Sequence, residues 1–350
     1  MNRDSFYQSI KSGKIMSCYL FEGEEEFTKE SALKTLRSAV LKEDVTGLND
    51  TVFIDPSAQA LISCAETFPM MADKRFILVK DSSLLSSGRN QDTEEKRSLK
   101  TDDGDEVVKY LANLPPTVCV VFYIKGKAAA NRKLYKLINK LGGLVTFDPL
   151  DQNTLIKWIK QKFKSFGKQI NSATAEQIIF AVGTNMHTLS HEVAKLAASA
   201  SENESISLQD IENISTKSTE YKVFDLADAL ISGQSFRVDS LMNKMLQEGE
   251  QRLMLLSLLQ RQFRQLFFIK ILLDDNQKTD QISRQLSLSS YVVRKLQPMA
   301  LKYDVSYLHW AYNLLIDTEF LVKSGQIFEE GSLEQAVYRI LSRQIKEKND

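Results

Sequence analysis

The sequence predicts an α/β domain with a parallel sheet, followed by a region that is all-α. Over residues 1–147, short apolar runs alternate with amphipathic helical segments, which is typical of a parallel sheet covered by helices on both faces. From about residue 148 the strand-like runs stop and helical periodicity continues. A chain of 350 residues is expected to hold two or three domains, and we predict domains at 1–147, 148–215 and 216–350.

Five apolar runs are predicted as strands because each is short and bounded by Gly, Pro or charged residues. After the first run, the spacing of Ala32, Leu36 and Val40 places them on one face of a helix from Phe27 to about Lys42. The stretch 82–106 is mostly polar and has little to bury, so we expect a mobile loop there. The predicted strands cover residues 18–21, 51–54, 76–80, 119–124 and 144–147.

The region after residue 148 is predicted to be helical. Its first helix ends at Gly167, which is a typical C-terminal stop. The segment 250–274 is apolar on nearly every side, so it must be buried in a domain core or in a subunit interface. The helices predicted in the last third of the chain cover 223–232, 235–247, 250–274, 279–286, 289–301, 304–323 and 332–346.

The composition excludes a strong overall electrostatic field, because the chain has no net charge. Lys and Arg total 45, as do Asp and Glu, so no net charge steers the chain onto nucleic acid or a membrane. Cys18, Cys64 and Cys119 lie far apart without metal-ligand spacing, which fits a reducing compartment. No stretch reads as a signal peptide or approaches the roughly 20 apolar residues of a membrane helix. We therefore expect a soluble, cytoplasmic protein that makes no membrane contact.

The first predicted strand is followed by Gly23 and a helix, which is where a nucleotide-binding domain places its phosphate loop. A working loop, GxxxxGK[ST], offers backbone amides, a lysine and a hydroxyl to the phosphates and magnesium. Here the glycine is followed by Glu24, Glu25 and Glu26, and Lys29 comes a turn too late. Unpaired carboxylates would repel a triphosphate by on the order of 4 kcal/mol per close contact. An alternative explanation of these glutamates is that acidic residues in the first turn stabilise a helix through its dipole, without any other role.

Both interpretations argue against ordinary nucleotide binding, and other candidate chemistry is sparse. The strand at 119–124 ends in the sequence KGK, where a magnesium-holding, water-activating motif would need acidic residues. His187 and His191 have the i, i+4 spacing of zinc ligands but lack a third ligand, so we expect exposed or packing histidines. With three histidines in the chain, no Ser–His–Asp or Cys–His set can be placed. We predict no catalytic residue, no metal and no cofactor.

The segment "ETFPMMADKRFILVKD" contains a helix-to-strand turn with unusual apolar content. A helix must end before Pro69, and the next strand begins soon after. Phe68, Met70 and Met71 therefore lie on a turn, where side chains tend to be exposed, and methionine suits an adaptable apolar contact. The alternative, which the residues alone favour, is that these side chains fold back under the sheet. If exposed, this cluster is the first candidate for a partner-binding surface.

Six segments, taken in order, resemble one family. They are "CYLFEGEEEF", "ETFPMMADKRFILVKD", "NTLIKWIKQKFKSFGKQI", "VFDLADALISGQSFRVDSLMNKML", "LLSLLQRQFRQLFFIKILL" and the closing "FLVKSGQ" with "SLEQAVYRIL". Their order and spacing resemble the delta subunit of the bacterial DNA polymerase III clamp loader, and the likeness covers nearly the whole chain. No single segment is diagnostic.

The resemblance implies a degenerate AAA+ domain at 1–147, a small helical lid domain at 148–215 and a helical collar at 216–350. It implies a non-catalytic subunit of a DNA-directed DNA polymerase holoenzyme, which binds the sliding clamp and opens it for loading onto primed DNA. The implied partners are the clamp, the ATP-binding and delta-prime-like loader subunits at the collar, and primed DNA through the complex.

The resemblance also implies a binding site on the clamp. In the family, an apolar pair at the helix-to-strand turn of the first domain inserts into a hydrophobic pocket of the clamp. Aligning "MADKRFILV" on that turn places Met70 and Met71 at the pair, with Phe68 and Pro69 beside them. Leucine and phenylalanine are familiar at these positions, so the two methionines depart from the usual pattern.

Two alternatives remain at this stage. One is an active P-loop-type ATPase with an unusual loop, which the missing lysine disfavours. The other is a helix-turn-helix DNA-binding protein, because residues 279–296 read as helix, turn and helix. The second helix of that pair carries Arg294 and Lys295 but few side chains suited to reading bases.

Overall fold

The computed structural model describes residues 1–42, 44, 47–86, 104–199, 206, 210–211 and 217–347. The chain forms two compact units, Met1–Leu150 and Asp151–Asp350, each with its own hydrophobic core. The finer division into 1–147, 148–215 and 216–350 stays a prediction.

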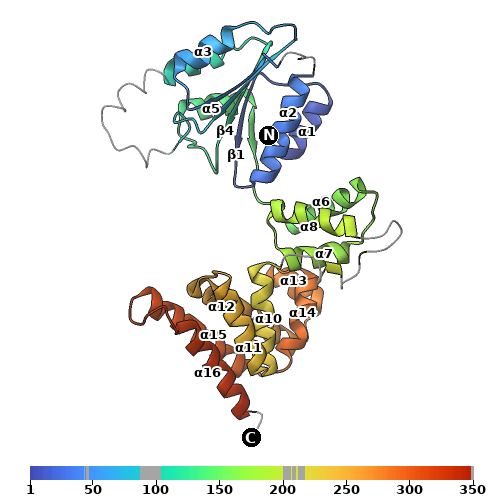
Figure 1. Cartoon of the computed structure of the whole chain (residues 1–350), viewed down its shortest axis with the longest axis vertical. Helices are drawn as coiled ribbons and strands as arrows, with labels where there is room; N and C mark the ends of the chain where they lie inside the picture. Colours follow the sequence, from blue (N-terminus) through green and yellow to red (C-terminus); the bar gives the residue numbers. More distant parts are fainter. Residues whose placement is uncertain are drawn as a thin grey trace. The chain divides into compact units, whose positions relative to one another are not determined.

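The first unit is built on a five-stranded parallel sheet with the order β2-β3-β4-β1-β5 (Figure 1). On strand β1, which lies between β4 and β5, Leu20 is opposite Phe122 of β4 and Leu144 of β5. Such strands are buried on both faces and therefore read as continuous apolar runs, as the sequence predicted. The strands are β1 Cys18–Glu22, β2 Asp50–Ile54, β3 Arg75–Lys80, β4 Val118–Tyr123 and β5 Leu144–Thr146.

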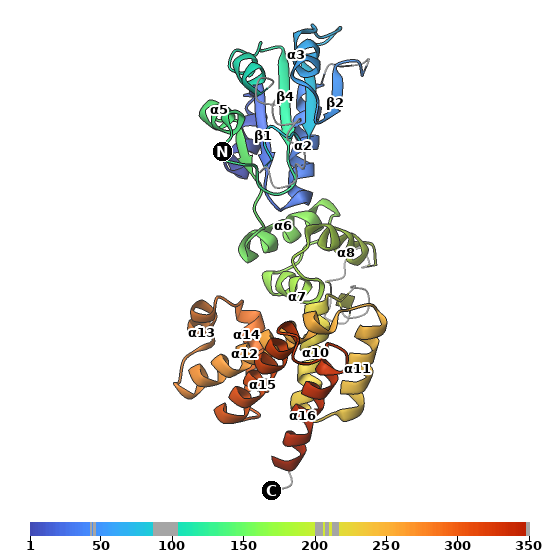
Figure 2. The same cartoon turned by 90° about the vertical axis from the view of Figure 1, so that its left-hand side faces the viewer.

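Helices cover both faces of this sheet (Figures 1 and 2). On one face, Phe6 of α1 and Leu36 of α2 are fully buried against the strands. On the other, Leu61 of α3 and Ile138 of α5 are buried in the same way. Each such side chain contributes about 1.5–3 kcal/mol of apolar transfer, which fixes these helices to the sheet. Their bounds are α1 Arg3–Lys11, α2 Glu26–Val40, α3 Ala58–Glu66 and α5 Lys133–Leu141.

Two features of this unit differ from the prediction. Helices α1 and α5 were not predicted; each has nine residues, and α1 buries Phe6 completely while Ile10 packs beside it. The predicted loop at 82–106 falls mainly on 87–103, outside the described residues. The prediction was wrong at the two ends of this stretch. At the first end Leu85 is buried in the core, and at the second a helix begins at residue 104. A leucine that can reach an apolar core packs into it even from a polar stretch.

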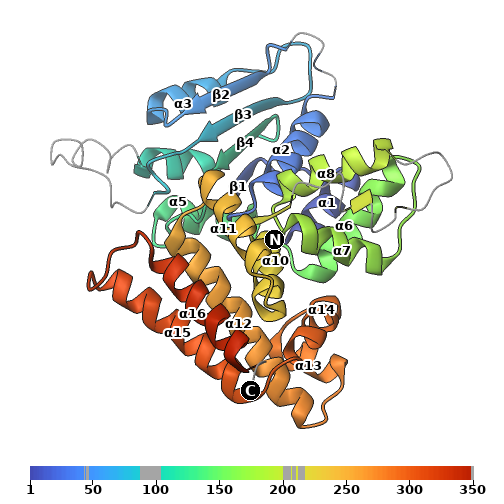
Figure 3. The same ribbon diagram turned by 60° about the horizontal axis from the view of Figure 1, so that its bottom comes forward.

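The second unit is helical in its described part, as predicted (Figure 3). Several helices begin at a Ser, Asp or Asn whose side-chain oxygen accepts a bond from a backbone N–H, each worth about 1 kcal/mol. Asp151, Asn171, Ser218 and Asp304 are examples. The helices are α6 Gln152–Ser165, α7 Ser172–Val182, α8 Met186–Ser199, α10 Thr219–Ser232, α11 Ser235–Gln247, α12 Arg252–Asp274, α13 Thr279–Leu286, α14 Ser290–Ala300, α15 Val305–Lys323 and α16 Ser332–Glu347.

Helix α12 lies in the core of the second unit, which confirms its predicted burial. Leu256, Leu259, Phe263, Leu266 and Ile269 are fully buried along it. Its neighbours are α10, α14 and α15, the last lying alongside it (Figure 3). An all-round apolar helix is stable only in such surroundings.

The first unit places its two candidate features at opposite edges of the sheet. Gly23 follows the carboxyl end of β1, whereas Met70 and Met71 precede the amino end of β3. Because all the strands are parallel, these ends belong to opposite edges. A change at one feature therefore does not alter the contacts of the other directly.

Candidate functional site

The turn between α3 and β3 exposes three large apolar side chains. The exposed fractions are 82% for Phe68, 55% for Met70 and 83% for Met71. Helix α3 ends at Glu66, and extended backbone follows as the approach to Pro69 predicts. The alternative in which these side chains fold back under the sheet is therefore wrong.

The backbone of this turn has a defined conformation. The Met70 N–H donates to Asn49 Oδ1 at 2.7 Å, and Asn49 Nδ2 donates to the Met70 carbonyl at 2.8 Å. Met71 has φ of +52°, in the left-handed region that is unfavourable for a residue with a side chain. The turn thus presents the methionine side chains from a fixed and locally strained backbone.

At the opposite edge, Gly23 occupies a position that only glycine can fill. Its φ is +118°, and a Cβ there would lie 2.2 Å from the Phe147 carbonyl oxygen. Its N–H donates to the Gly126 carbonyl at 2.6 Å, which ties the loop to the end of β4. The glycine therefore serves close approach between backbone segments, and no ligand is needed to explain it.

The backbone amides of this loop are engaged within the chain. The Glu25 N–H donates to the Phe147 carbonyl at 3.0 Å, and the Glu26 N–H donates to the Glu24 carbonyl at 3.1 Å. The Phe27 N–H donates to the Glu25 side chain, which caps α2 as an acidic first turn should. A phosphate nest needs several convergent amides that are free to donate, and these are already committed.

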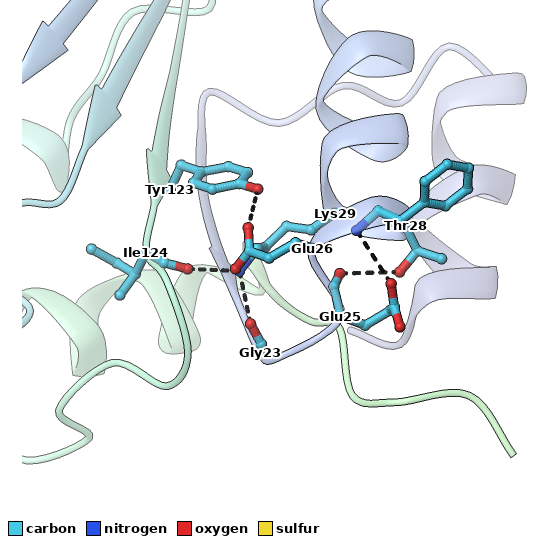
Figure 4. A network of polar contacts seen from close by, with 8 residues as sticks. Gly23, Glu25, Glu26, Thr28, Lys29, Tyr123 and Ile124 are labelled. Atoms are coloured by element: carbon cyan, nitrogen blue, oxygen red, sulfur yellow. Dashed lines mark hydrogen bonds and ion pairs between the residues drawn. The ribbon is translucent and has the colours of Figure 1, made fainter. Parts of the chain in front are cut away.

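Lys29, in the first turn of α2, extends its side chain into the loop (Figure 4). Its ammonium is completely buried and donates to three oxygens: the Gly23 carbonyl at 2.7 Å, the Ile124 carbonyl at 2.8 Å and Glu26 Oε1 at 2.7 Å. It also lies 4.9 Å from the centroid of the Tyr123 ring. All three ammonium donors are used, so this buried cation is stable without an external anion.

Glu26 is paired, which corrects the expectation of unpaired carboxylates. Its Oε1 accepts from Lys29 and its Oε2 accepts from the Tyr123 hydroxyl at 2.7 Å. Burial raises the pKa of this carboxyl, whereas the bonds from Lys29 and Tyr123 lower it, and the net pKa is below the usual value. The same burial and the bond to Glu26 raise the pKa of Tyr123.

A depressed pKa links Glu26 to stability in acid. The carboxylate stabilises the fold above the pKa of the unfolded chain, about 4.3, and this contribution is lost as the pH falls through the lower folded pKa. We expect Glu26→Gln to lower the free energy of unfolding by about 1 kcal/mol at pH 7, since the group is partly exposed and screened. Urea unfolding at pH 3 should show a smaller difference between the variant and the wild type than at pH 7, because the carboxylate is increasingly protonated in acid.

A matched control is Glu30→Gln, an exposed glutamate on the same helix. It should behave like the wild type at both pH values. If Glu26→Gln were equally destabilised at pH 7 and pH 3, the ion pair would not be the source of the effect.

The remaining candidate chemistry does not assemble into a site. His187 and His191 are exposed on α8. Across the described parts of the chain, no three His, Cys, Asp or Glu side chains are grouped to hold a metal. None of the helices in those parts is long and apolar enough to cross a membrane.

The structure includes two functional candidates that the sequence did not indicate. Lys29 was rejected as a phosphate ligand, yet it fills the loop, and its partner Ile124 lies far along the chain. Asn49 precedes β2 within "GLND", which reads only as a turn. A lysine at the start of a helix and an asparagine in a turn are common, so the local sequence does not predict which distant residues they will bond.

The fold and the site together define a class of protein. It has a parallel α/β domain arranged like a phosphate-loop domain, with the loop filled by its own side chains, and a helical region that follows it in the sequence. Residues 19–148 match the model of the family "DNA polymerase III, delta subunit", and residues 220–340 match "DNA polymerase III delta subunit, C-terminal domain".

Relatives agree along the length of the chain. DNA polymerase III subunit delta of Bacillus subtilis (strain 168) is 24% identical over 349 residues, 98% of each chain. A probable DNA polymerase III subunit delta of Aquifex aeolicus (strain VF5) is 24% identical over 140 residues, 39% of this chain and 40% of that protein. The solved structure of the Bacillus subtilis DNA clamp loader delta protein shares the fold, with a TM-score of 0.53 at 20% identity over 97% of this chain and 99% of that one.

The chain belongs to the delta-subunit family of DNA polymerase III. Its members are components of the clamp loader and act in DNA replication. The resemblance inferred from the sequence is thereby confirmed, as is the α/β-plus-helical fold.

Proposed function

We propose that this chain binds a ring-shaped sliding clamp through the turn at residues 68–71 and favours its open form for loading onto primed DNA. The observation that carries the proposal is the exposure of Phe68, Met70 and Met71 side by side on one turn. Large apolar side chains grouped on a monomer surface mark a contact site. Membership of the delta-subunit family supports a clamp as the partner.

The proposed mechanism is differential binding. A closed ring shifts toward its open form only if the ligand binds that form more tightly. Burying two methionine side chains offers about 3–5 kcal/mol of apolar transfer before ordering costs are deducted. That range can bias a strained ring interface, and Phe68 and Pro69 would extend the contact.

The chain itself is proposed to be non-catalytic. The N–H groups of Gly23, Glu25, Glu26 and Phe27 are bonded within the chain, and the Lys29 ammonium is already shared among three internal oxygens. Binding ATP there would require breaking these bonds and placing phosphates beside Glu26. In this proposal ATP is bound by neighbouring loader subunits, which control when the apolar turn is available.

The helical region is proposed to hold the chain in the loader. The exposed fractions of Phe236, Phe320 and Phe328 are 87%, 62% and 90%, so the second unit presents large apolar side chains. Partner subunits that bind ATP or resemble delta-prime would bury such residues at the collar.

The experiment that tests the proposal is a binding titration of the full chain with a purified bacterial sliding clamp. Saturable binding supports it, and no binding at micromolar concentrations contradicts it. A parallel titration with magnesium–ATP separates the ATPase alternative, which requires measurable affinity of the chain alone.

The helix-turn-helix alternative is not supported by the surroundings of α14. Val293, Leu296 and Met299 of this helix are buried in the core. On its exposed side Arg294 lies 3.9 Å from Glu176 of α7. A recognition helix needs a free face for bases, and this face is partly occupied.

Met71→Gly is expected to change stability and binding in opposite directions. Glycine has no Cβ to strain at φ of +52°, so the free energy of unfolding should rise by up to about 1 kcal/mol. The apolar side chain is lost at the same time, so clamp affinity should fall several-fold. Urea unfolding and the clamp titration measure the two effects, and equal or higher clamp affinity would contradict the proposal.

A further inference from the structure

We propose that Asn49 is a positioning residue for the apolar turn, which acts on clamp binding through Met70 and Met71 without touching the clamp. This inference rests on the proposed function. Asn49 is fully buried, so it is not itself available to a partner.

The contact between Asn49 and Met70 is reciprocal. The side-chain amide accepts from the Met70 N–H at 2.7 Å and donates to the Met70 carbonyl at 2.8 Å. One side chain thus satisfies both backbone groups of a single residue, as a neighbouring strand would. Only an amide side chain offers a donor and an acceptor side by side, because aspartate would present two acceptors.

Asn49 is itself fixed by the sheet. Its carbonyl accepts from the Phe76 N–H at 2.7 Å, which extends the pairing of β2 with β3. Its own N–H donates to Asp44 Oδ2 at 3.2 Å. The backbone of Asn49 is therefore fixed by the strands, and its side-chain amide in turn fixes the position of the turn.

The turn depends on this anchor. Across residues 68–74, all within the described part of the chain, the backbone hydrogen bonds are the two between Met70 and Asn49. Met71, the next residue, has a left-handed backbone conformation that is intrinsically unfavourable. We expect it to keep this conformation only while the hydrogen bonds to Asn49 fix the backbone of Met70. Releasing the turn adds conformational freedom that clamp binding must then remove, which weakens affinity about tenfold per freed residue.

The test is a cycle of four proteins titrated with a purified sliding clamp: the wild type, Asn49→Ala, the double variant with Met70→Ala and Met71→Ala, and the triple variant. We expect Asn49→Ala to weaken binding about tenfold in the wild type and less than twofold in the double variant. Such non-additivity shows that Asn49 acts through the methionines. An equal loss in both backgrounds, or no loss in the wild type, overturns the inference.

Lys29→Met is the control for general loss of stability. Lys29 lies at the opposite edge of the same sheet and is also completely buried. This variant should lose stability and keep full clamp affinity at a temperature where it is folded. If it weakens clamp binding as much as Asn49→Ala does, the effect of Asn49 is merely structural and the inference fails.

Hydrogen exchange gives a second readout that does not depend on the clamp. In the wild type the Met70 amide should be the slowly exchanging site within residues 68–74, and in Asn49→Ala this one amide should exchange at least tenfold faster. Protection of β3 should be unchanged. Unchanged exchange over 68–74 would overturn the inference.

The clamp titrations also distinguish a failure of the inference about Asn49 from a failure of the proposed function. Undiminished affinity in the double methionine variant removes the proposed function and this inference with it. Weakened affinity in that variant with unchanged affinity in Asn49→Ala removes this inference alone.

Discussion

Replacing Met70 and Met71 together with alanine is expected to weaken binding to a sliding clamp at least tenfold. Both side chains are exposed in the free chain, so the free energy of unfolding should change little. Tenfold corresponds to about 1.4 kcal/mol, well below the apolar transfer of about 3–5 kcal/mol that two buried methionines offer. The measurement is a titration of each protein with purified clamp, combined with urea unfolding.

Phe328→Ala is the matched control for this variant. Phe328 is 90% exposed but lies in the second unit, so its truncation removes comparable apolar surface without touching the turn. Clamp affinity should stay at the wild-type value. An unchanged affinity in the double methionine variant would remove the turn as the clamp contact.

Lys29→Met is expected to lower the free energy of unfolding by on the order of 3 kcal/mol. Methionine fills much of the same volume, but the carbonyls of Gly23 and Ile124 lose their donor and Glu26 loses its counter-ion. The buried ammonium joins the start of α2 to the ends of β1 and β4, so the loss should appear as reduced cooperative stability of the first unit. Urea unfolding followed by circular dichroism measures it.

Lys34→Met controls for the chemistry of the change. Lys34 is an exposed lysine on the same helix, and its substitution should alter stability by less than about 0.5 kcal/mol. A similar loss in both variants would show that the buried ion pair is not a major contact.

Together these variants separate binding from stability. The methionine turn lies at the amino edge of the sheet and contributes exposed side chains, whereas Lys29 lies at the carboxyl edge and is buried. The loop after β1 lacks the phosphate-loop motif, and the Lys29 ammonium gives it a structural role by joining the start of α2 to the segments after β1 and β4. The two edges are free to change independently.

Most of the secondary structure was predictable from local pattern. Parallel strands buried on both faces form apolar runs, and α11 and α13 have the predicted bounds, 235–247 and 279–286. Helix α1 was not predicted: it is short, and Phe6 is its one fully buried residue, with Tyr7 and Ile10 packed against the same core while partly exposed. The order of the strands was also not predicted, since neighbours such as β1 and β5 pair across more than a hundred residues.

The candidate site was predictable only in part. Pro69 and the two methionines mark the turn because proline stops a helix and turns are commonly exposed. The sequence could not decide whether the side chains faced solvent or the core, because both placements satisfy the same local pattern. The polar partners of the turn and of the loop depend on distant residues, as with Lys29 and Ile124.

The sequence by itself determined most of the elements, the family resemblance and the absence of the phosphate-binding motif, because these depend on residue type and short-range spacing. Only the tertiary structure decided that Met70 and Met71 are exposed, that Asn49 holds their backbone and that Lys29 fills the loop. The physical reason is that burial and hydrogen bonding are set by which segments meet in space. The local sequence pattern limits which segments can pack together, but it does not specify which tertiary contacts form.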